Sequence, residues 1–202
     1  MARPANRSSY HHGDLRAALI DIAVELIAER GVDGFSLAEA SRRLGVAVSA
    51  PYRHFTDRDD LVAAAALRGC AILIDTLAAE TASATTAEDR LAAAARAYVR
   101  FAAEHRALFE AVFAGPAHGF RDPRLEEAAA PVKRTFQDAA LTVTGGDAVA
   151  AEVLGLSVVT VAHGHAGMLR LGAFGPDAID TAVDRAGRAA LAVIAGRDQL
   201  KA

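Results

Sequence analysis

The sequence predicts an all-α protein, for two reasons. Apolar residues recur at intervals of three and four residues along the whole chain, which places them on one face of successive helices. Strand signals are scarce, because runs of β-branched residues with period-two alternation are short and few. Hydrophobic residues make up 52% of the 202 residues and charged residues 23%, a composition that excludes disorder. We expect about nine helices.

The first two helices are predicted over about residues 14–30 and 36–43. Gly31 follows the first helix at a position where a helix C-cap favours positive φ. Ser36, with Glu39 three residues later, forms the S-x-x-E pattern that caps a helix N-terminus. The apolar face of the first helix consists of Leu15, Ala18, Leu19, Ile22, Ala23, Leu26 and Ile27.

Pro51 determines where a third, very short helix begins. Proline is tolerated in the first turn of a helix, where its missing N–H has no partner, and costs about 3 kcal/mol in the interior. After the turn at Gly45 and Val46, this helix therefore starts near Val48 or Ser49. A capped helix, a glycine turn and a short second helix are typical of the helix-turn-helix, whose second helix enters the DNA major groove.

Six more helices follow the predicted helix-turn-helix. Thr56 and Asp59 offer a cap for the first and longest of them. Clusters rich in Ala, Ser and Thr, and Gly-Pro and Gly-Gly pairs, separate several of them. The six are predicted over about 57–81, 86–104, 105–114, 122–143, 147–171 and 176–195.

Composition excludes several kinds of site. Cys70 is the only cysteine, so neither an intrachain disulfide nor a cysteine-based zinc site can form. The net charge of −3 gives no global nucleic-acid signal, so any DNA-binding surface must be local. No uninterrupted run of about eighteen strongly apolar residues occurs, and no apolar signal core follows Arg3 and Arg7, so we expect a cytoplasmic protein with no membrane contact.

The residues of the short third helix suit DNA. Arginine can read guanine or bind phosphate, tyrosine and histidine can donate to phosphate oxygens, and a small residue such as Ala50 lets the backbone approach base edges. Tyr52 could instead be a core aromatic residue, as we expect of Phe55, and Arg53 and Arg58 could be solvated charges. The N-terminal arm is locally cationic and could lie along phosphates or in the minor groove, or could be a tail with no role: it carries Arg3, Arg7, Tyr10, His11 and His12.

The stretch from Asp14 to Leu61 resembles the N-terminal domain of the tetracycline-repressor (TetR) family. The motifs that carry the resemblance are the first helix ending in E-R-G, F-S-L-A-E-A, L-G-V at the turn, and Y-R-H-F followed by D-R-D-D-L. The opening S-Y-H-H-G-D-L-R is also similar to members of this family. The remaining two-thirds of the chain fit the family's ligand-binding and dimerisation domain in layout only.

The resemblance implies a homodimeric transcriptional regulator, usually a repressor, that leaves a palindromic DNA operator when a small molecule binds its larger domain. It implies an arm over 1–13, a DNA-binding domain over 14–60 and an effector-binding and dimerisation domain over 61–202. Implied phosphate contacts come from Tyr52, His54 and Arg58, the last where the family usually has lysine. The implied groove-reading residues are Ser36, Val48, Ser49, Ala50 and Arg53, of which Val48 and Ala50 have no hydrogen-bonding side chain.

The last two predicted helices are long and amphipathic, which suits pairing with the same helices of a second copy, although simple core packing explains their apolar residues equally well. Side chains that might line an effector pocket are mostly apolar, so we expect a largely hydrophobic effector. The residues predicted for this pocket are Tyr98, Phe101, Phe113, Phe136, His163 and Met168.

Two other functions compete with this interpretation. An enzyme would need a catalytic constellation, and the dense candidates are His11-His12-x-Asp14 and His163-Gly164-His165. Residues two apart on a helix point about 200° from each other, so His163 and His165 cannot share a metal. We therefore expect no enzyme, no metal and no cofactor. The other alternative is a DNA-binding dimer that responds to no effector. An enclosed cavity in the larger domain would favour an effector-responsive regulator over this alternative.

Overall fold

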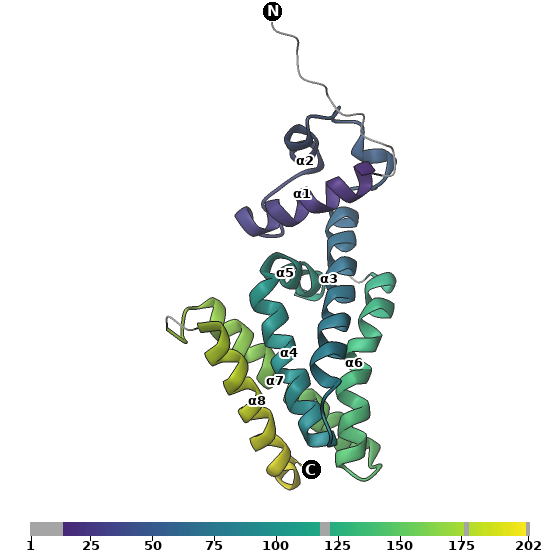
Figure 1. Ribbon diagram of the computed structural model, residues 1–202. Coiled ribbons are helices and arrows are strands. Elements are labelled where there is room, and N and C mark those ends of the chain that lie inside the picture. The colour runs from purple at the N-terminus through teal and green to yellow at the C-terminus, as the bar shows by residue number, and fades with distance from the viewer. Residues whose placement is uncertain (1–13, 118–121, 176–177, 201–202) are drawn as a thin grey trace, which may run out of the picture.

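The structure is a computed structural model, and it describes residues 14–117, 122–175 and 178–200 (Figure 1). Within these ranges the chain forms eight α-helices and two short 3-10 segments and no strand, which confirms the predicted all-α class and lies close to the predicted nine helices. The elements are α1 Asp14–Arg30, α2 Leu37–Leu44, η1 Pro51–Arg53, α3 Arg58–Thr81, α4 Ala87–Glu104, α5 Arg106–Ala117, α6 Pro123–Val143, α7 Ala148–Arg170, α8 Ala178–Ala195 and η2 Arg197–Leu200.

The helices form a small unit at one end and a larger bundle below it (Figure 1). α1, α2 and η1 make up the small unit, and α3 starts beside them and runs down into the bundle. α4 lies in the middle of the bundle, where it contacts α3, α6, α7 and α8. α5 packs across α3 beneath α1, so both parts of the chain share one continuous apolar core.

The turns around α2 follow the signals in the sequence. Gly31 and Gly45 both have positive φ, 75° and 69°, as the left-handed C-cap conformation requires. The N–H of Gly45 donates to the carbonyls of Ser41 and Arg42. At the other end of α2, the Ser36 hydroxyl oxygen accepts the N–H of Glu39 at 3.2 Å. Only this half of the capping box forms, because the Glu39 carboxylate pairs with Arg30 at 2.6 Å.

The third predicted helix is a 3-10 segment rather than an α-helix. Its hydrogen bonds run mainly from residue i+3 to residue i, as between the His54 N–H and the Pro51 carbonyl at 2.8 Å. Pro51 is the first residue of η1, in agreement with its predicted place in a first turn. The predicted start near Val48 or Ser49 is two to three residues too early, because the chain there forms a turn in which the Ala50 N–H donates to the Ala47 carbonyl. The chain must turn inward at Phe55, which is 2% exposed, so too few residues remain for an α-helical ladder.

The predicted cap of α3 is also wrong by one residue. The carboxylate of Asp57, and not the hydroxyl of Thr56, accepts the N–H of Asp60 at 2.9 Å. The N–H of Thr56 in turn donates to the Asp60 carboxylate at 3.1 Å. α3 therefore starts at Arg58, and a carboxylate replaces the weaker hydroxyl as its cap.

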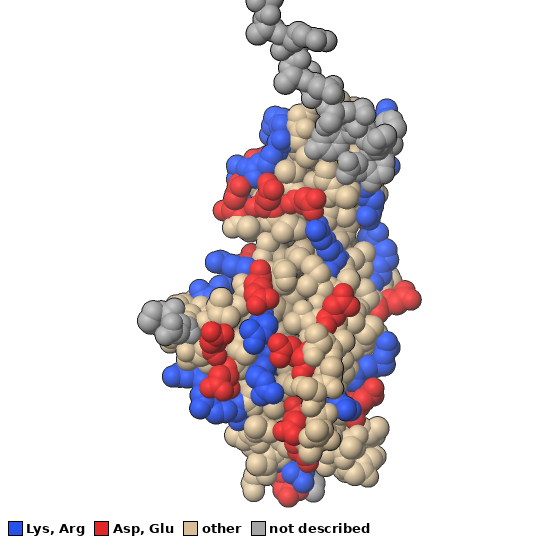
Figure 2. Space-filling model, viewed as in Figure 1, with Lys and Arg blue, Asp and Glu red and all other residues tan. Residues whose placement is uncertain are grey.

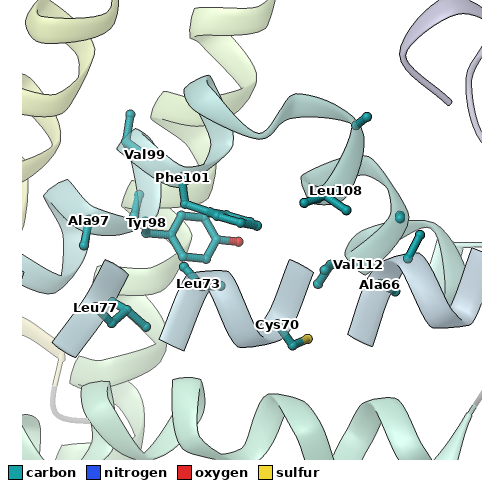
Figure 3. Close-up of a cluster of buried hydrophobic side chains, with 14 of the residues drawn as sticks. Ala66, Cys70, Leu73, Leu77, Ala97, Tyr98, Val99, Phe101, Leu108 and Val112 are labelled. Atoms are coloured by element: carbon teal, nitrogen blue, oxygen red, sulfur yellow. The ribbon is translucent and has the colours of Figure 1, made fainter. Parts of the chain in front are cut away.

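Two of the described helices, α3 and α7, have the length and apolar composition of a membrane span, although the sequence has no uninterrupted apolar run. α3 contacts α1, α4, α5 and α6, and Cys70, Leu73 and Leu77 on it are buried (Figure 3). α7 packs against α4, α6 and α8 but leaves more of its apolar surface exposed. For α3, burial in a protein core accounts for the apolar composition.

Candidate nucleic-acid interface and ligand cavity

The segment from Val48 to Phe55 presents polar side chains outward on an apolar base. Pro51 and Phe55 are buried, and the Arg16 guanidinium lies 5.3 Å from the centre of the Phe55 ring. Tyr52 is 59% exposed, so it is not a core residue. Residues 48–54 form the reading head. Pro51 and the adjacent Phe55 attach it to the core, and its other side chains are available to a partner.

The sequence-predicted DNA contacts lie on two neighbouring parts of the small unit. In the reading head, Val48, Ser49, Tyr52 and Arg53 are exposed, while Ala50 and His54 are half-buried. Ser36 lies at the N-terminus of α2, and its hydroxyl keeps a hydrogen to donate while its oxygen caps the helix. The predicted groove and phosphate contacts stay predictions, since no nucleic acid is present.

Arg58, the remaining predicted contact, is held by two carboxylates. Its Nη1 donates to the Asp33 carboxylate at 3.1 Å, and its Nη2 donates to the Asp59 carboxylate at 2.6 Å. The hydrogen bond to Asp59, followed by the charges of Asp59 and Asp33, raises the pKa of Arg58 above its ordinary value. A phosphate that binds Arg58 must therefore displace or join these carboxylates.

The other arginines of the small unit fall into paired and unpaired groups. Arg43 donates to the Glu29 carboxylate at 2.7 Å, and this hydrogen bond lowers the pKa of Glu29. Arg30 pairs with Glu39. Among the described residues, the side chains of Arg42 and Arg53 have no carboxylate partner. Figure 2 shows basic side chains over both flanks of the small unit and acidic ones along its lower edge.

A cavity of about 840 Å³ lies in the larger bundle, between α3, α4, α5, α6 and α7. Three of the predicted effector residues, Tyr98, Phe113 and Phe136, line it. Figure 3 shows the Tyr98 ring beside Leu73 of α3, and Leu73 and Cys70 also line the cavity. The wall is mainly apolar, and an aromatic side chain stands on each of three helices.

The other three predicted effector residues lie elsewhere. Phe101 is fully buried behind the wall and contacts Phe109, with the two ring centres 6.4 Å apart. Met168 is 49% exposed on α7. His163 lies in a separate groove of about 610 Å³, but its Nδ1 is hydrogen bonded to the Tyr98 hydroxyl at 2.9 Å. It therefore does not line the cavity but contacts two residues of its wall, Tyr98 and Phe113, with the His163 and Phe113 ring centres 5.0 Å apart.

Sequence reasoning missed most of the cavity wall. The missed residues are small, aliphatic or polar, and helical periodicity marks only the buried ones as inward-facing, without indicating which of them face an empty space. Glu126, Lys133, Glu152 and Leu156 are exposed at the rim. Burial raises the pKa of the Tyr98 hydroxyl, which keeps this group protonated. Hydrogen bonding to Arg124 lowers the pKa of the Asp122 carboxyl at the cavity edge. The missed lining residues are Cys70, Leu73, Val112, Asp122, Leu125, Glu126, Ala129, Val132, Lys133, Gln137, Glu152, Gly155, Leu156 and Val159.

The two histidines on α7 point in different directions, as expected from their spacing. His163 contacts Tyr98, whereas the His165 ring lies 2.8 Å from the Val161 carbonyl and stacks on Phe174. No cluster of three metal-binding side chains occurs in the described part of the chain. The other histidine pair, His11 and His12, lies outside the described residues, as does the rest of the arm over 1–13.

An exposed reading head behind a capped helix, set on a larger helical bundle with a cavity, is the arrangement of a helix-turn-helix protein with a second helical domain. Comparisons with known proteins identify the family. Residues 91–194 match the tetracyclin repressor-like C-terminal domain, and residues 19–65 match the bacterial regulatory proteins of the tetR family. The chain belongs to the TetR family of DNA-binding transcriptional regulators, as its motifs predicted.

Individual relatives agree with this assignment. The uncharacterized HTH-type transcriptional regulator YobS of Bacillus subtilis is 31% identical over 93 residues, which are 46% of this chain and 48% of that protein. The match thus spans about half the length of that relative. A solved structure of unknown function from Rhodococcus sp. RHA1 is 31% identical with a TM-score of 0.73, covering 92% of this chain and 98% of that one.

A regulator from Saccharomonospora viridis, solved in complex with choline, is similar in fold. It is 18% identical with a TM-score of 0.69, and the match covers 91% of this chain and 97% of that one.

Proposed function

We propose that the chain is a homodimeric repressor that leaves a palindromic operator when a small, largely hydrophobic molecule enters the cavity. The observation that carries this proposal is the position of α3. Its residues Cys70 and Leu73 line the cavity, and its first residue, Arg58, lies beside the reading head. A ligand in the cavity therefore contacts the same helix that supports the predicted DNA contacts. We place the protein in the cytoplasm, where such a regulator meets DNA.

We propose a division of the chain into an arm over 1–13, a DNA-binding domain over 14–60 and an effector-binding and dimerisation domain over 61–202. Phosphate contacts are assigned to Tyr52, His54 and Arg58. The remaining contacts are assigned to base edges, where direct readout depends mainly on Ser49 and Arg53, and methyl contacts on Val48 and Ala50. Their exposure or partial exposure supports this assignment.

The proposed dimer forms through α7 and α8, the helices predicted over about 147–171 and 176–195. α7 and its C-cap residue Leu171 carry large apolar side chains that are exposed in a single subunit, with Val149 75%, Leu156 65% and Leu171 78% exposed. Their spacing of seven and fifteen residues keeps them on one side of the helix. Gly164 and Gly167 have no atom within 4 Å of an added Cβ, which leaves space for a partner helix. On α8, apolar side chains instead pack inside the subunit, as Val183, Ala190 and Ile194 do.

The proposed effector is small and largely hydrophobic, because Tyr98, Phe113 and Phe136 form much of an apolar wall. Aromatic faces also attract organic cations. The Saccharomonospora viridis regulator, which has a similar fold, was solved with choline, an organic cation, and this supports a cationic head group on the effector. The cavity is not the enclosed one that would distinguish an effector-dependent regulator from a DNA-binding dimer whose larger domain only dimerises, because Lys133, Glu152 and Leu156 of its wall are exposed. Its volume and its apolar wall support the effector-dependent regulator.

Selection of bound sequences from a random DNA pool tests the DNA-binding part of the proposal. We expect an inverted repeat, because two subunits related by a two-fold axis recognise two equivalent half-sites. Recovery of a single asymmetric site would contradict the homodimer. The selected duplex then serves as the probe for effectors.

A matched series of ligands tests the effector class. Octanol, octyltrimethylammonium and octyl sulfate share one alkyl chain and differ in head group. We expect octanol or the ammonium compound to raise the melting temperature and to release the duplex. Ala129→Phe fills the cavity and should abolish both effects, whereas Glu127→Phe, an exposed position of α6 outside the cavity wall, should preserve them. Stabilisation by sugars or polyanions alone would overturn the hydrophobic class.

A further inference from the structure

Two adjacent arginines on α2 have different surroundings. The Arg43 guanidinium is bound to α1, at 2.7 Å from the Glu29 carboxylate and 3.9 Å from that of Glu25. The Arg42 side chain is exposed and makes no ion pair or side-chain hydrogen bond with any residue that the structure describes. The Arg42 guanidinium is therefore available to a partner molecule, whereas the Arg43 guanidinium is already bound.

The direction of α2 explains this difference. Residues four apart share one side of a helix, so Glu39 and Arg43 lie on the side that pairs with α1. Ala38 and Arg42 lie on another side, away from these ion pairs. Side chains in a helix lean towards its N-terminus, so Arg42 leans over Ala38 and in the direction of Ser36. The methyl group of Ala38 is too small to block that path.

The other predicted DNA contacts supply little unpaired positive charge on the small unit. Val48 and Ala50 supply no hydrogen-bonding side chain to the reading head, and Arg58 is occupied by Asp33 and Asp59. Affinity for DNA depends largely on cations that neutralise phosphates. The unpaired guanidinium on the Ser36 side of α2 is suited to that task.

We propose that Arg42 contacts a backbone phosphate of DNA and that Arg43 does not. The proposal rests on the proposed DNA-binding surface, since it takes Ser36 as a residue that faces the duplex. Arg42 then supplies sequence-independent affinity on the α2 side, while Arg53 acts in the reading head. Arg43 keeps a structural role, because its guanidinium joins α2 to α1.

The two arginines provide a matched experiment on the full-length protein. Wild type, Arg42→Ala, Arg43→Ala and Arg42→Lys are titrated onto a fluorescent duplex of mixed sequence, about 30 base pairs long, at several salt concentrations. Both arginines lie in the last turn of α2, where a cation favours the helix, so Arg43→Ala controls for that effect. Circular dichroism checks that each variant is folded.

We expect Arg42→Ala to reduce the slope of log affinity against log salt by about 0.9 for each copy of Arg42 on the DNA. The corresponding loss of affinity at about 0.1 M salt is roughly eightfold per copy. Arg43→Ala should keep the wild-type slope, and Arg42→Lys should restore it. Equal slopes for Arg42→Ala and the wild type would overturn the proposed role of Arg42 and leave the proposed DNA-binding function standing. Absence of salt-dependent binding by the wild-type protein would overturn the proposed function as well.

Discussion

Replacing Asp33 with asparagine should strengthen DNA binding. The Asp33 carboxylate accepts a hydrogen bond from the Arg58 guanidinium at 3.1 Å, and Asp59 accepts from the same group at 2.6 Å. A phosphate that binds Arg58 competes with both. Asparagine keeps the size of the side chain and an acceptor oxygen but removes the charge, so Asp33→Asn weakens one of the two competitors.

The size of this effect follows from the exposure of the pair. The side chains are 32% exposed for Arg58 and 61% for Asp33, so the interaction is worth about 0.2–1 kcal/mol, as for other exposed ion pairs. Its loss should lower Kd by up to about fivefold per subunit, since about 1.4 kcal/mol is tenfold. The same change should reduce the free energy of unfolding by at most about 1 kcal/mol.

Fluorescence anisotropy with a mixed-sequence duplex measures the change, and Asp21→Asn is the control. Asp21 pairs with Arg68 further along α3, so this variant removes an equal charge without touching Arg58. We expect Asp33→Asn to tighten binding clearly more than Asp21→Asn. An equal gain from both variants would show a general charge effect. Weaker binding by Asp33→Asn would refute the reasoning, because it would mean that Asp33 orients Arg58 towards DNA.

Three further predictions concern the dimer, the cavity and the helix-turn-helix. Val149→Arg places a charge on the exposed apolar side of α7, outside the cavity wall, and should yield monomers in analytical ultracentrifugation, whereas Leu141→Arg on α6 should not. Burial raises the pKa of Tyr98 above its ordinary value of 10.0, so the folded state holds this proton longer than the unfolded state. The contribution of Tyr98 to the free energy of unfolding is therefore fully present below pH 10 and is lost as the pH rises further. Above pH 10, the free energy of unfolding measured by chemical denaturation should fall less with pH for Tyr98→Phe than for the wild type. Gly45→Ala, at a φ of 69°, should lower the free energy of unfolding by about 1–2 kcal/mol in chemical denaturation.

The sequence predicted the fold and the helix-turn-helix well because their signals are local. A cap, a left-handed glycine and a first-turn proline each act within a few residues, and Ser36, Gly45 and Pro51 occupy the places that their chemistry requires. The α-helical form of the third helix was not correct, because burial of Phe55 restricts its length through contacts that are distant in the sequence.

The cavity was predicted only in part, for a different physical reason. Helical periodicity separates inward-facing from outward-facing residues, but an inward-facing side chain can meet a neighbour or an empty space. Phe101 and Phe136 have the same periodic signal, yet Phe101 is packed behind the wall and Phe136 forms it. Likewise, the charge of Arg58 is evident in the sequence, but its pairing with Asp33 depends on how the turn after α1 folds.

The unbroken course of α3 has a mechanical consequence. Twelve residues separate Arg58 from Cys70, which is about 18 Å of continuous helix without a hinge. If the cavity end tilts by about 6°, such a rigid rod displaces its tip by roughly 2 Å. In a symmetric pair the two tips would move in opposite senses, changing their separation by roughly 4 Å against the fixed repeat of about 34 Å between successive major-groove sites. In the proposed dimer, a slight shift of the cavity wall by a ligand would therefore move the two reading heads away from the spacing of successive major-groove sites.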